Sequence, residues 1–239
     1  MSWEPEAENW LLWARTPGHD AYWHYRDSFF SAIVPPAGRL TLEVGSGEGR
    51  VARDLAERGH RVVGIDTSPT LVRHAAEADG RGRYLVAAAE ALPFAAASFD
   101  LVVAYNALMD VDDLEASVRE AARVLEPGGR LSVSVTHPFA DAGRFVDDEF
   151  VVGGAYLERS RFEGTDERNG LVMNWRGWNH PLSDYTRALE AAGLLLESMR
   201  EPAPETVNER WRRIPMFLQF RALKIAEETQ VSPANPPAG

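Results

Sequence analysis

The sequence predicts an α/β fold, a doubly wound and mostly parallel sheet with helices on both faces. Three observations predict it. Short apolar runs alternate with helical segments between residues 39 and 136, most of these runs are continuously apolar, and a glycine-rich turn follows the first of them. Continuous apolar runs are typical of parallel strands that helices cover on both faces. Strand–helix–strand repetition joins such strands by right-handed crossovers.

The individual elements follow from local patterns. Apolar and aromatic residues at helical spacing predict two N-terminal helices, over residues 2–15 and 20–33. Strands are predicted at five apolar runs, residues 39–44, 61–66, 83–88, 99–105 and 130–136. Helices are predicted between them, over residues 49–60, 68–78 and 112–125. Gly59 ends the first of these helices, Ser68 is the expected N-cap of the second, and the EPGG segment ends the third.

The pattern changes after residue 137. Residues 138–180 read as irregular and aromatic, with one strand over 171–178. A helix follows over 183–193, with Ser183 as its cap and Gly193 at its end, and then two strands over 194–201 and 216–226. The predicted organisation is given by four ranges: a helical N-terminal cap (1–37), a ligand-binding core (38–137), a substrate-side segment that completes the sheet (138–228) and a disordered tail (229–239).

Composition excludes several kinds of site. The chain has no cysteine, which excludes disulfides, cysteine-based zinc sites and thiol catalysis. Its six histidines are scattered, which argues against a transition-metal centre. The acids of residues 110–113 read as the start of a helix, where carboxylates complement the helix dipole, rather than as a magnesium site. No metal site is therefore predicted.

Charge and hydropathy indicate the partners. The net charge of −11 opposes binding to nucleic acid or anionic lipid, because such binding relies on clustered cations. The basic cluster at 210–215 lies among acids and reads as a solvated or ion-paired surface. No apolar run is long enough to span a bilayer, and the acidic N-terminus does not resemble a signal peptide, so a cytoplasmic location is expected.

The glycine-rich turn at 45–49, GSGEG, predicts a ligand site. In open parallel sheets, ligands bind beyond the carboxyl ends of the strands, and three alternating glycines exceed what helix packing needs. A dinucleotide fingerprint would place its third glycine at position 50, where this chain has Arg50. Glu43 and Glu48 would repel a pyrophosphate but suit a cationic ligand.

A second acid narrows the choice of ligand. Asp66 ends the second predicted strand, where a carboxylate can accept hydrogen bonds from both hydroxyls of a ribose. Its position alone is also consistent with a cap for the turn before Ser68. The spacing favours a nucleoside, and the charge favours S-adenosylmethionine, which carries a sulfonium and an ammonium and no phosphate.

These residues resemble the class I S-adenosylmethionine-dependent methyltransferases, in particular the small-molecule branch that includes the ubiquinone and menaquinone biosynthesis enzymes. The resemblance covers residues 40–139 and rests on three segments, LEVGSGEGRVARDLAERGHRVVGIDTSPTLVRHA, AEALPFAAASFDLVVAYNALMDVDD and REAARVLEPGGRLSVSVTHPF. It implies a Rossmann-like, mostly parallel seven-stranded sheet behind a helical N-terminal cap. It also implies methyl transfer from S-adenosylmethionine to a small-molecule acceptor, with S-adenosylhomocysteine as the product.

The resemblance also implies roles for particular residues. The methionine part of the cofactor would contact Glu43, Gly45, Ser46 and Gly47, and its ribose would bind Asp66. The adenine would lie beside Thr67, Leu71, Ala89 and Glu90. Tyr105 and Asn106 would line the cofactor site at the top of the fourth strand. Arg26 in the cap is the suggested partner of the cofactor carboxylate. The chain departs from the family at two positions: Ala88 replaces a frequent Asp, and Asp110 replaces a frequent His.

Two histidines are the candidates for a general base, which is useful only if the acceptor must lose a proton. His137 follows the fifth strand on the cofactor side of the sheet, and it could instead fix the turn before Pro138. His180 precedes Pro181 in the late segment and could also be structural. His19 and His24 in the cap read as structural or rim residues.

The tryptophans indicate where an acceptor would bind. All of them lie outside residues 38–137, at positions 3, 10, 13, 23, 175, 178 and 211. One interpretation is that they line an aromatic pocket for a flat, apolar molecule. An equally good one is that they pack the N-terminal cap onto the core. Two other functions remain open at this stage, a non-catalytic S-adenosylmethionine-binding or regulatory module and an NAD-dependent oxidoreductase. The oligomeric state is not predicted.

Overall fold

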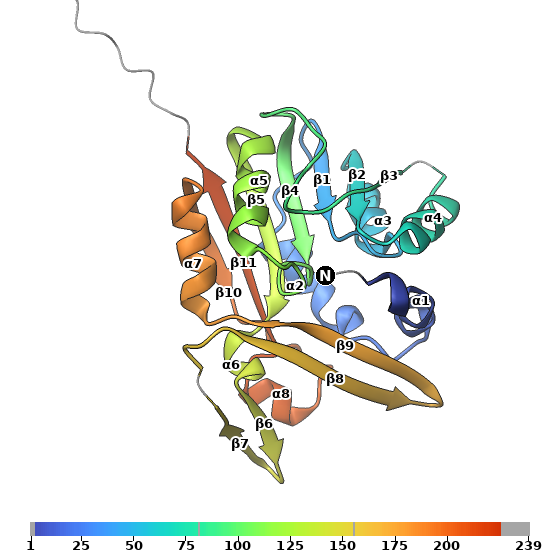
Figure 1. Ribbon diagram of the computed structural model, residues 1–239, viewed down its shortest axis with the longest axis vertical. Coiled ribbons are helices and arrows are strands. Elements are labelled where there is room, and N and C mark those ends of the chain that lie inside the picture. The colour runs from blue at the N-terminus through green and yellow to red at the C-terminus, as the bar shows by residue number, and fades with distance from the viewer. Residues whose placement is uncertain (1–2, 81, 155, 226–239) are drawn as a thin grey trace, which may run out of the picture.

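The computed structural model describes residues 3–80, 82–154 and 156–225, and its centre is a seven-stranded sheet (Figure 1). The strands lie in the order β10-β11-β5-β4-β1-β2-β3. Their bounds are Thr41–Val44 (β1), Val62–Asp66 (β2), Arg83–Val86 (β3), Phe99–Tyr105 (β4), Leu125–Thr136 (β5), Leu194–Arg200 (β10) and Phe217–Lys224 (β11). β1 to β5 are parallel, and β11 is antiparallel to both β5 and β10. The predicted doubly wound, mostly parallel sheet is confirmed.

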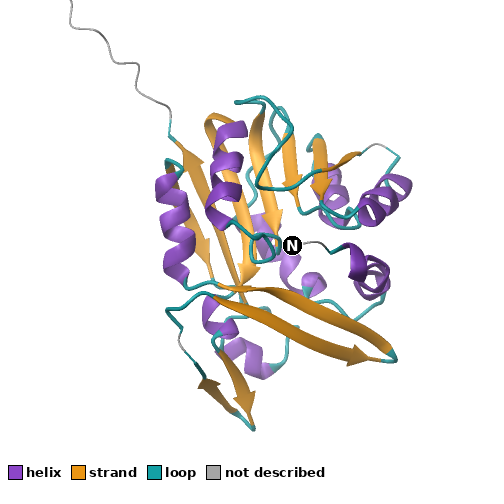
Figure 2. Ribbon diagram, in the orientation of Figure 1, coloured by secondary structure: helices purple, strands orange, loops and turns teal. Residues whose placement is uncertain are grey.

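Helices cover both faces of this sheet (Figure 2). Their bounds are Tyr22–Ala32 (α2), Arg50–Glu57 (α3), Pro69–Ala78 (α4), Leu114–Val124 (α5) and Leu182–Ala191 (α7). Side chains alternate between the faces along β4: Val102 packs in the core with residues of α5 and α7, and Val103 packs in the core with residues of α2 and α3. Both side chains are fully buried, which is why β4 reads as a continuous apolar run.

The N-terminal cap differs slightly from the prediction. A short 3₁₀ turn, Glu4–Glu6 (η1), precedes the helix Ala7–Arg15 (α1), and residue 2 lies outside the described residues. The Glu4 carboxylate accepts hydrogen bonds from the hydroxyls of Ser68 and Thr70, so η1 lies against the start of α4. This anchor places α1 beside the carboxyl ends of β1 and β2.

The strand predicted over 171–178 is confirmed, but the prediction that the rest of residues 138–180 is irregular is wrong. They form a short helix and two antiparallel hairpins, with the bounds Pro138–Asp141 (α6), Gly143–Val146 (β6), Glu149–Val152 (β7), Ser160–Arg168 (β8) and Leu171–Asn179 (β9). β8 lacks an apolar alternation because its residues are almost all exposed. The Asn169–Gly170 pair, both with positive φ, is the turn signal that could have revealed the β8–β9 hairpin. Figure 1 shows this hairpin crossing the end of the sheet.

Smaller differences concern the last third of the chain. α7 begins one residue before Ser183, with Pro181 at the N-cap position. A further helix, Glu209–Arg213 (α8), contains most of the basic cluster, and its Arg210 pairs with Asp148 between β6 and β7. The predicted tail, 229–239, lies outside the described residues. Among the helices that are described, none is long and apolar enough to cross a bilayer.

Candidate functional site

A cavity of about 1180 Å³ lies where the strands of the parallel sheet end. The glycine turn after β1 and the loop after β4 form its floor, and α1 and the β8–β9 hairpin cover it. Eleven of the twelve predicted cofactor residues line it: Glu43, Gly45, Ser46, Gly47, Asp66, Thr67, Leu71, Ala89, Glu90, Tyr105 and Asn106. Tertiary structure therefore brings together residues that span more than 60 positions of the sequence.

The glycine turn is held tightly against its neighbours. Gly45 has a φ of +71°, and a Cβ on it would lie 2.4 Å from the Cβ of Ala107. The backbone N–H of Gly47 donates to Asp66 Oδ2, and the N–H of Ser68 donates to Oδ1, both at 2.9 Å. Asp66 thus fixes the turn after β1 and the start of α4 at once. Each of its oxygens keeps a lone pair for a further hydrogen bond.

Glu43 provides an uncompensated acid beside this turn. Its Oε2 atom is buried and has no hydrogen-bond partner among the described residues. Burial, and next the charge of Asp66, raise the pKa of Glu43 well above its usual value. Burying a carboxylate without a partner is costly, and a cationic group in the cavity would relieve that cost. The residues present therefore fit the ammonium of S-adenosylmethionine.

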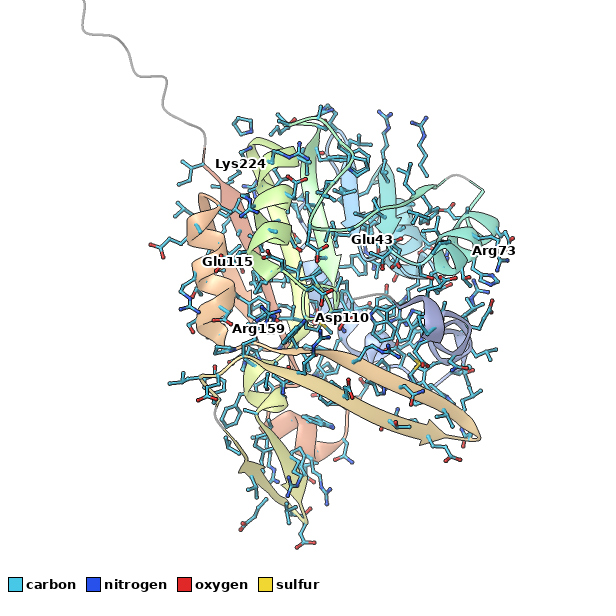
Figure 3. All side chains as sticks on the ribbon, viewed as in Figure 1. Glu43, Arg73, Asp110, Glu115, Arg159 and Lys224 are labelled. Carbon is cyan, nitrogen blue, oxygen red and sulfur yellow. The ribbon has the colours of Figure 1, made fainter. Side chains whose placement is uncertain are left out.

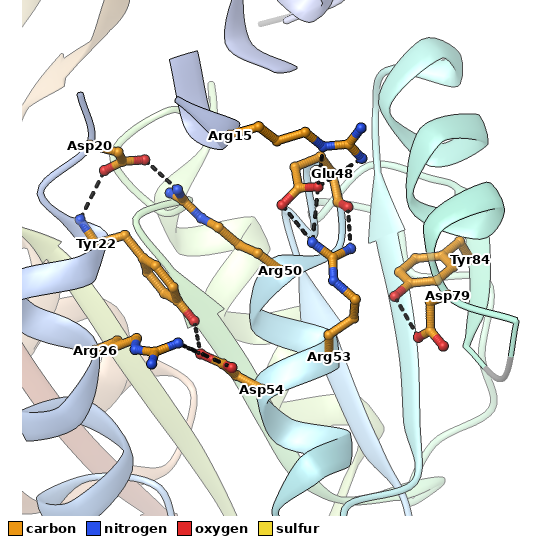
Figure 4. Close-up of polar contacts among 10 residues, drawn as sticks. All are labelled: Arg15, Asp20, Tyr22, Arg26, Glu48, Arg50, Arg53, Asp54, Asp79 and Tyr84. Atoms are coloured by element: carbon orange, nitrogen blue, oxygen red, sulfur yellow. Dashed lines mark hydrogen bonds and ion pairs between the residues drawn. The ribbon is translucent and has the colours of Figure 1, made fainter. Parts of the chain in front are cut away.

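Glu48, by contrast, does not present a free charge to a ligand. Its carboxylate lies 2.8 Å from Arg53 Nη2 and 3.0 Å from Arg15 Nε (Figure 4). These two guanidinium groups compensate its charge within the protein. The electrostatic argument against a pyrophosphate at the turn therefore rests on Glu43 rather than on both acids.

Arg26, the twelfth predicted cofactor residue, is outside the cavity lining. It forms an ion pair with Asp54, at 3.0 Å, between α2 and α3 (Figure 4). The arginines among the described residues that line the cavity are Arg50, Arg168 and Arg176. Arg50 pairs with Asp20 and lies over the rings of Trp10 and Tyr22. The assignment of Arg26 is corrected accordingly. Sequence reasoning used Arg50 only as a departure from the dinucleotide fingerprint.

Tryptophans of the cap and the hairpin meet above the glycine turn. Trp3, Trp10 and Trp13 each have their ring centroid within 6.3 Å of the ring centroid of Trp175 in β9. These four line the cavity, as do Trp178 and Trp211, whereas Trp23 lies outside it. The tryptophans therefore have both expected roles, because they join the cap to the hairpin and give the cavity aromatic walls.

Neither histidine predicted as a base faces the cavity. His137 is the N-cap of α6: its Nδ1 accepts from the Phe139 N–H at 3.0 Å, and its Nε2 lies 2.9 Å from Glu201. His180 Nδ1 lies 3.2 Å from Asp184. Burial lowers the pKa of both imidazoles. Both predictions are corrected, because the His137 ring caps α6 and contacts Glu201, the His180 ring contacts Asp184, and neither residue lines the cavity. The histidines in the cavity lining are His19 and His24.

Comparisons with known proteins decide the family. The methyltransferase-domain family matches residues 42–133. A ubiquinone biosynthesis O-methyltransferase of Xanthomonas axonopodis pv. citri is 34% identical over 179 residues, which are 73% of this chain and 70% of that protein. The chain belongs to the class I S-adenosylmethionine-dependent methyltransferases.

Other matches agree with this family. A demethylmenaquinone methyltransferase of Tropheryma whipplei is 35% identical over 118 residues, 48% of this methyltransferase and 49% of that one. The fold is similar to that of an S-adenosylmethionine-dependent methyltransferase of Mesorhizobium loti, with a TM-score of 0.66, 24% identity and coverage of 85% and 98% of the two chains. S-adenosylmethionine is thus the cofactor, and the NAD-dependent and non-catalytic alternatives gain no support.

Two partly buried acids of the methyltransferase were not predicted as functional groups. Asp110, in the loop after β4, lies between the sheet and the β8–β9 hairpin (Figure 3). Asp141, in α6, lines the cavity farther along. Burial raises the pKa of Asp110 well above its usual value and the pKa of Asp141 to about 7. The described residues contain no group of three or more acids and histidines arranged to hold a metal ion.

The raised pKa of Glu43 predicts a proton linkage. A ligand ammonium favours the ionised carboxylate, so S-adenosylhomocysteine binding should release protons at pH values below the raised pKa of Glu43, and the affinity should rise as the pH approaches that pKa. Calorimetry in two buffers with different ionisation enthalpies measures the release. Glu43→Gln should reduce both the release and the pH dependence. Equal proton release by the wild type and this variant would refute the role of Glu43.

A stability prediction follows from the position of His137. His137→Ala removes the cap of α6 and should lower the free energy of unfolding by about 1 kcal/mol, while S-adenosylhomocysteine affinity stays unchanged. Urea unfolding and calorimetry measure the two quantities. His137→Asn, which keeps a capping group, should recover most of the loss. Loss of methyl transfer at unchanged stability would restore His137 as a base.

Proposed function

We propose that this methyltransferase acts on a small, flat aromatic acceptor that carries a hydroxyl group. The observation that carries the proposal is one continuous cavity of about 1180 Å³, which extends from the glycine turn to residues at the ends of β5 and β11. β1 and β5 are two strands apart, which corresponds to roughly 10 Å. One end of the cavity can therefore hold the cofactor while the other holds an acceptor.

The cofactor end is assigned to the residues around β1 and β2. The geometry supports Asp66 as the acceptor for the ribose hydroxyls and Glu43 as the partner of the ammonium. The neighbouring wall supports an adenine site formed by Thr67, Leu71, Ala89 and Glu90, and Tyr105 and Asn106 line the cavity at the carboxyl end of β4. Glu90 also accepts a hydrogen bond from the Asp112 N–H, which ties the adenine site to the loop after β4.

The acceptor end is apolar and aromatic. Phe217 begins β11 opposite Thr136, the last residue of β5, and its ring lies 4.8 Å from the ring of Tyr25 in α2. Met216 and Trp211 also line this part of the cavity. Aromatic walls with few polar groups suit a flat ring, and the net charge of −11 supports a small molecule rather than nucleic acid.

The named relatives support the same class of acceptor. One acts in ubiquinone biosynthesis as an O-methyltransferase, and another is a demethylmenaquinone methyltransferase. We infer from the first that oxygen is the methylated atom here. Bound S-adenosylmethionine supplies an electrophilic methyl group on a sulfonium. The chain must hold the acceptor oxygen about 3 Å from that carbon, in line with the breaking bond, and exclude water.

A radiolabelled methyl donor tests the proposal. The protein is incubated with a panel of flat phenols, catechols and naphthols, with their methyl ethers and with matched aromatic amines. We expect label in the hydroxylated compounds, accompanied by S-adenosylhomocysteine. Label only in the amines, or in no compound although S-adenosylhomocysteine binds, would refute the proposed acceptor class.

A further inference from the structure

Asp141 occupies a distinctive place at the acceptor end of the cavity. β5 ends at Thr136, and α6 then turns the chain so that its last residue, Asp141, lines the cavity with Thr136 and Phe217. The backbone of Asp141 is fixed by its N–H, which donates to the carbonyl of His137 at 3.1 Å. A short, capped helix therefore places Asp141 in the cavity lining beside the ends of β5 and β11, two strands away from the glycine turn after β1.

Within the described part of the chain, no hydrogen bond or ion pair shifts the pKa of the Asp141 carboxyl group. The titratable groups that face it are Asp110 from the loop after β4 and Tyr185 from α7, and Arg144 of β6 lines a small hollow next to it. Neither Asp110 nor Tyr185 can act as its counter-cation, and Arg144 is exposed. Burial alone raises the pKa of Asp141, to about 7, because no group lowers it.

We propose that Asp141 accepts the hydroxyl proton of the acceptor during methyl transfer, an inference that rests on the proposed function. The acceptor oxygen forms a bond to the methyl carbon, and the bond from that carbon to sulfur breaks, with its electron pair going to sulfur. The O–H bond breaks, and its proton passes to the Asp141 carboxylate. The resulting carboxylic acid then returns the proton to solvent. No oxidant, reductant or metal is needed for this balance.

The proposal predicts a pH-dependent preference that can be measured without turnover. An ionised Asp141 accepts a hydrogen bond from a hydroxyl but not from a methyl ether. The probes are 2-naphthol and 2-methoxynaphthalene, titrated by fluorescence against protein saturated with S-adenosylhomocysteine. At pH 8, above the pKa of Asp141, the wild type should bind the naphthol at least about tenfold more tightly than the ether. At pH 6 the protonated carboxyl can donate to either oxygen, and the ratio should fall toward one.

The variant Asp141→Asn keeps the shape of the side chain and removes its charge. Its naphthol-to-ether ratio should be small and equal at pH 6 and pH 8, with unchanged affinity for S-adenosylhomocysteine. Asp147→Asn, the same substitution at an exposed position between β6 and β7, should behave as the wild type. For each panel compound that is methylated, Asp141→Asn should lower kcat by about 100-fold or more with little change in KM.

The outcomes separate the two proposals. The assignment of Asp141 would be overturned if Asp141→Asn left the naphthol-to-ether affinity ratio unchanged. It would also be overturned if neither naphthalene bound to the wild type. Failure of every hydroxylated panel compound to accept a methyl group would count against the proposed acceptor class. Loss of S-adenosylhomocysteine binding in Asp141→Asn would also overturn the assignment, since it would place Asp141 at the cofactor end.

Discussion

Asp66→Ala should weaken S-adenosylhomocysteine binding by at least about 100-fold. The side chain lines the cavity at the end of β2, and its carboxylate already accepts hydrogen bonds from the backbone N–H groups of Gly47 and Ser68. Removing it takes away the proposed acceptor of the ribose hydroxyls and also releases the glycine turn from the start of α4. Hydrogen bonds to charged groups contribute about 1.5–3 kcal/mol each, so the loss of two is enough for this effect.

The measurement is calorimetric titration of the folded variant, with urea unfolding run in parallel. We expect a smaller loss for Asp66→Asn, which keeps one carbonyl oxygen. Asp27→Ala removes an exposed acid of α2, outside the cavity lining, and should bind as the wild type does. An affinity for Asp66→Ala within a few-fold of that of the wild type would show that the nucleoside binds elsewhere.

Gly45→Ala should abolish cofactor binding and destabilise the core of the methyltransferase. The residue has a φ of +71°, and the added Cβ would lie 2.4 Å from the Cβ of Ala107. Both side chains are single carbons with no rotamer to adopt, so the backbone itself must move. The turn after β1 and the loop after β4 would then separate at the floor of the cavity.

A matched glycine separates the collision from the backbone strain. Gly128 has a φ of +80°, but a Cβ there would meet no atom within 4 Å. Gly128→Ala should therefore lower the free energy of unfolding only by the backbone strain, about 1–2 kcal/mol, and leave the affinity for S-adenosylhomocysteine unchanged. Ala107→Gly should restore part of the affinity when it is combined with Gly45→Ala. Equal effects of Gly45→Ala and Gly128→Ala, or no rescue by Ala107→Gly, would refute the collision.

The parts of the site that were predicted correctly in position come from local sequence patterns. The turn at 45–49 and Asp66 each follow directly from a strand, and the carboxyl ends of neighbouring parallel strands meet at one edge of the sheet. The strands themselves are visible because burial on both faces makes them continuously apolar. Eleven residues of the cavity lining could therefore be named before the structure was known.

The predictions that failed concern partners that lie far apart in the sequence. Glu48 is compensated by Arg15, 33 positions away, and His137 is held by Glu201, 64 positions away. No pattern within either segment shows these contacts. β8, and with it the β8–β9 hairpin, was missed for a different reason: β8 is almost entirely exposed and buries little apolar surface, so the Asn169–Gly170 turn is the signal for the hairpin.

The sequence by itself determined the doubly wound sheet, the glycine turn and the acid at the end of β2. Each depends on hydrophobic periodicity or on the conformation of a few adjacent residues. Only the tertiary structure decided which acids lack an ion-pair partner, that Arg26 is outside the cavity lining, and that Asp141 rather than His137 lines the cavity. Burial and ion pairing set these properties, and both depend on contacts between segments that the order of residues leaves unspecified.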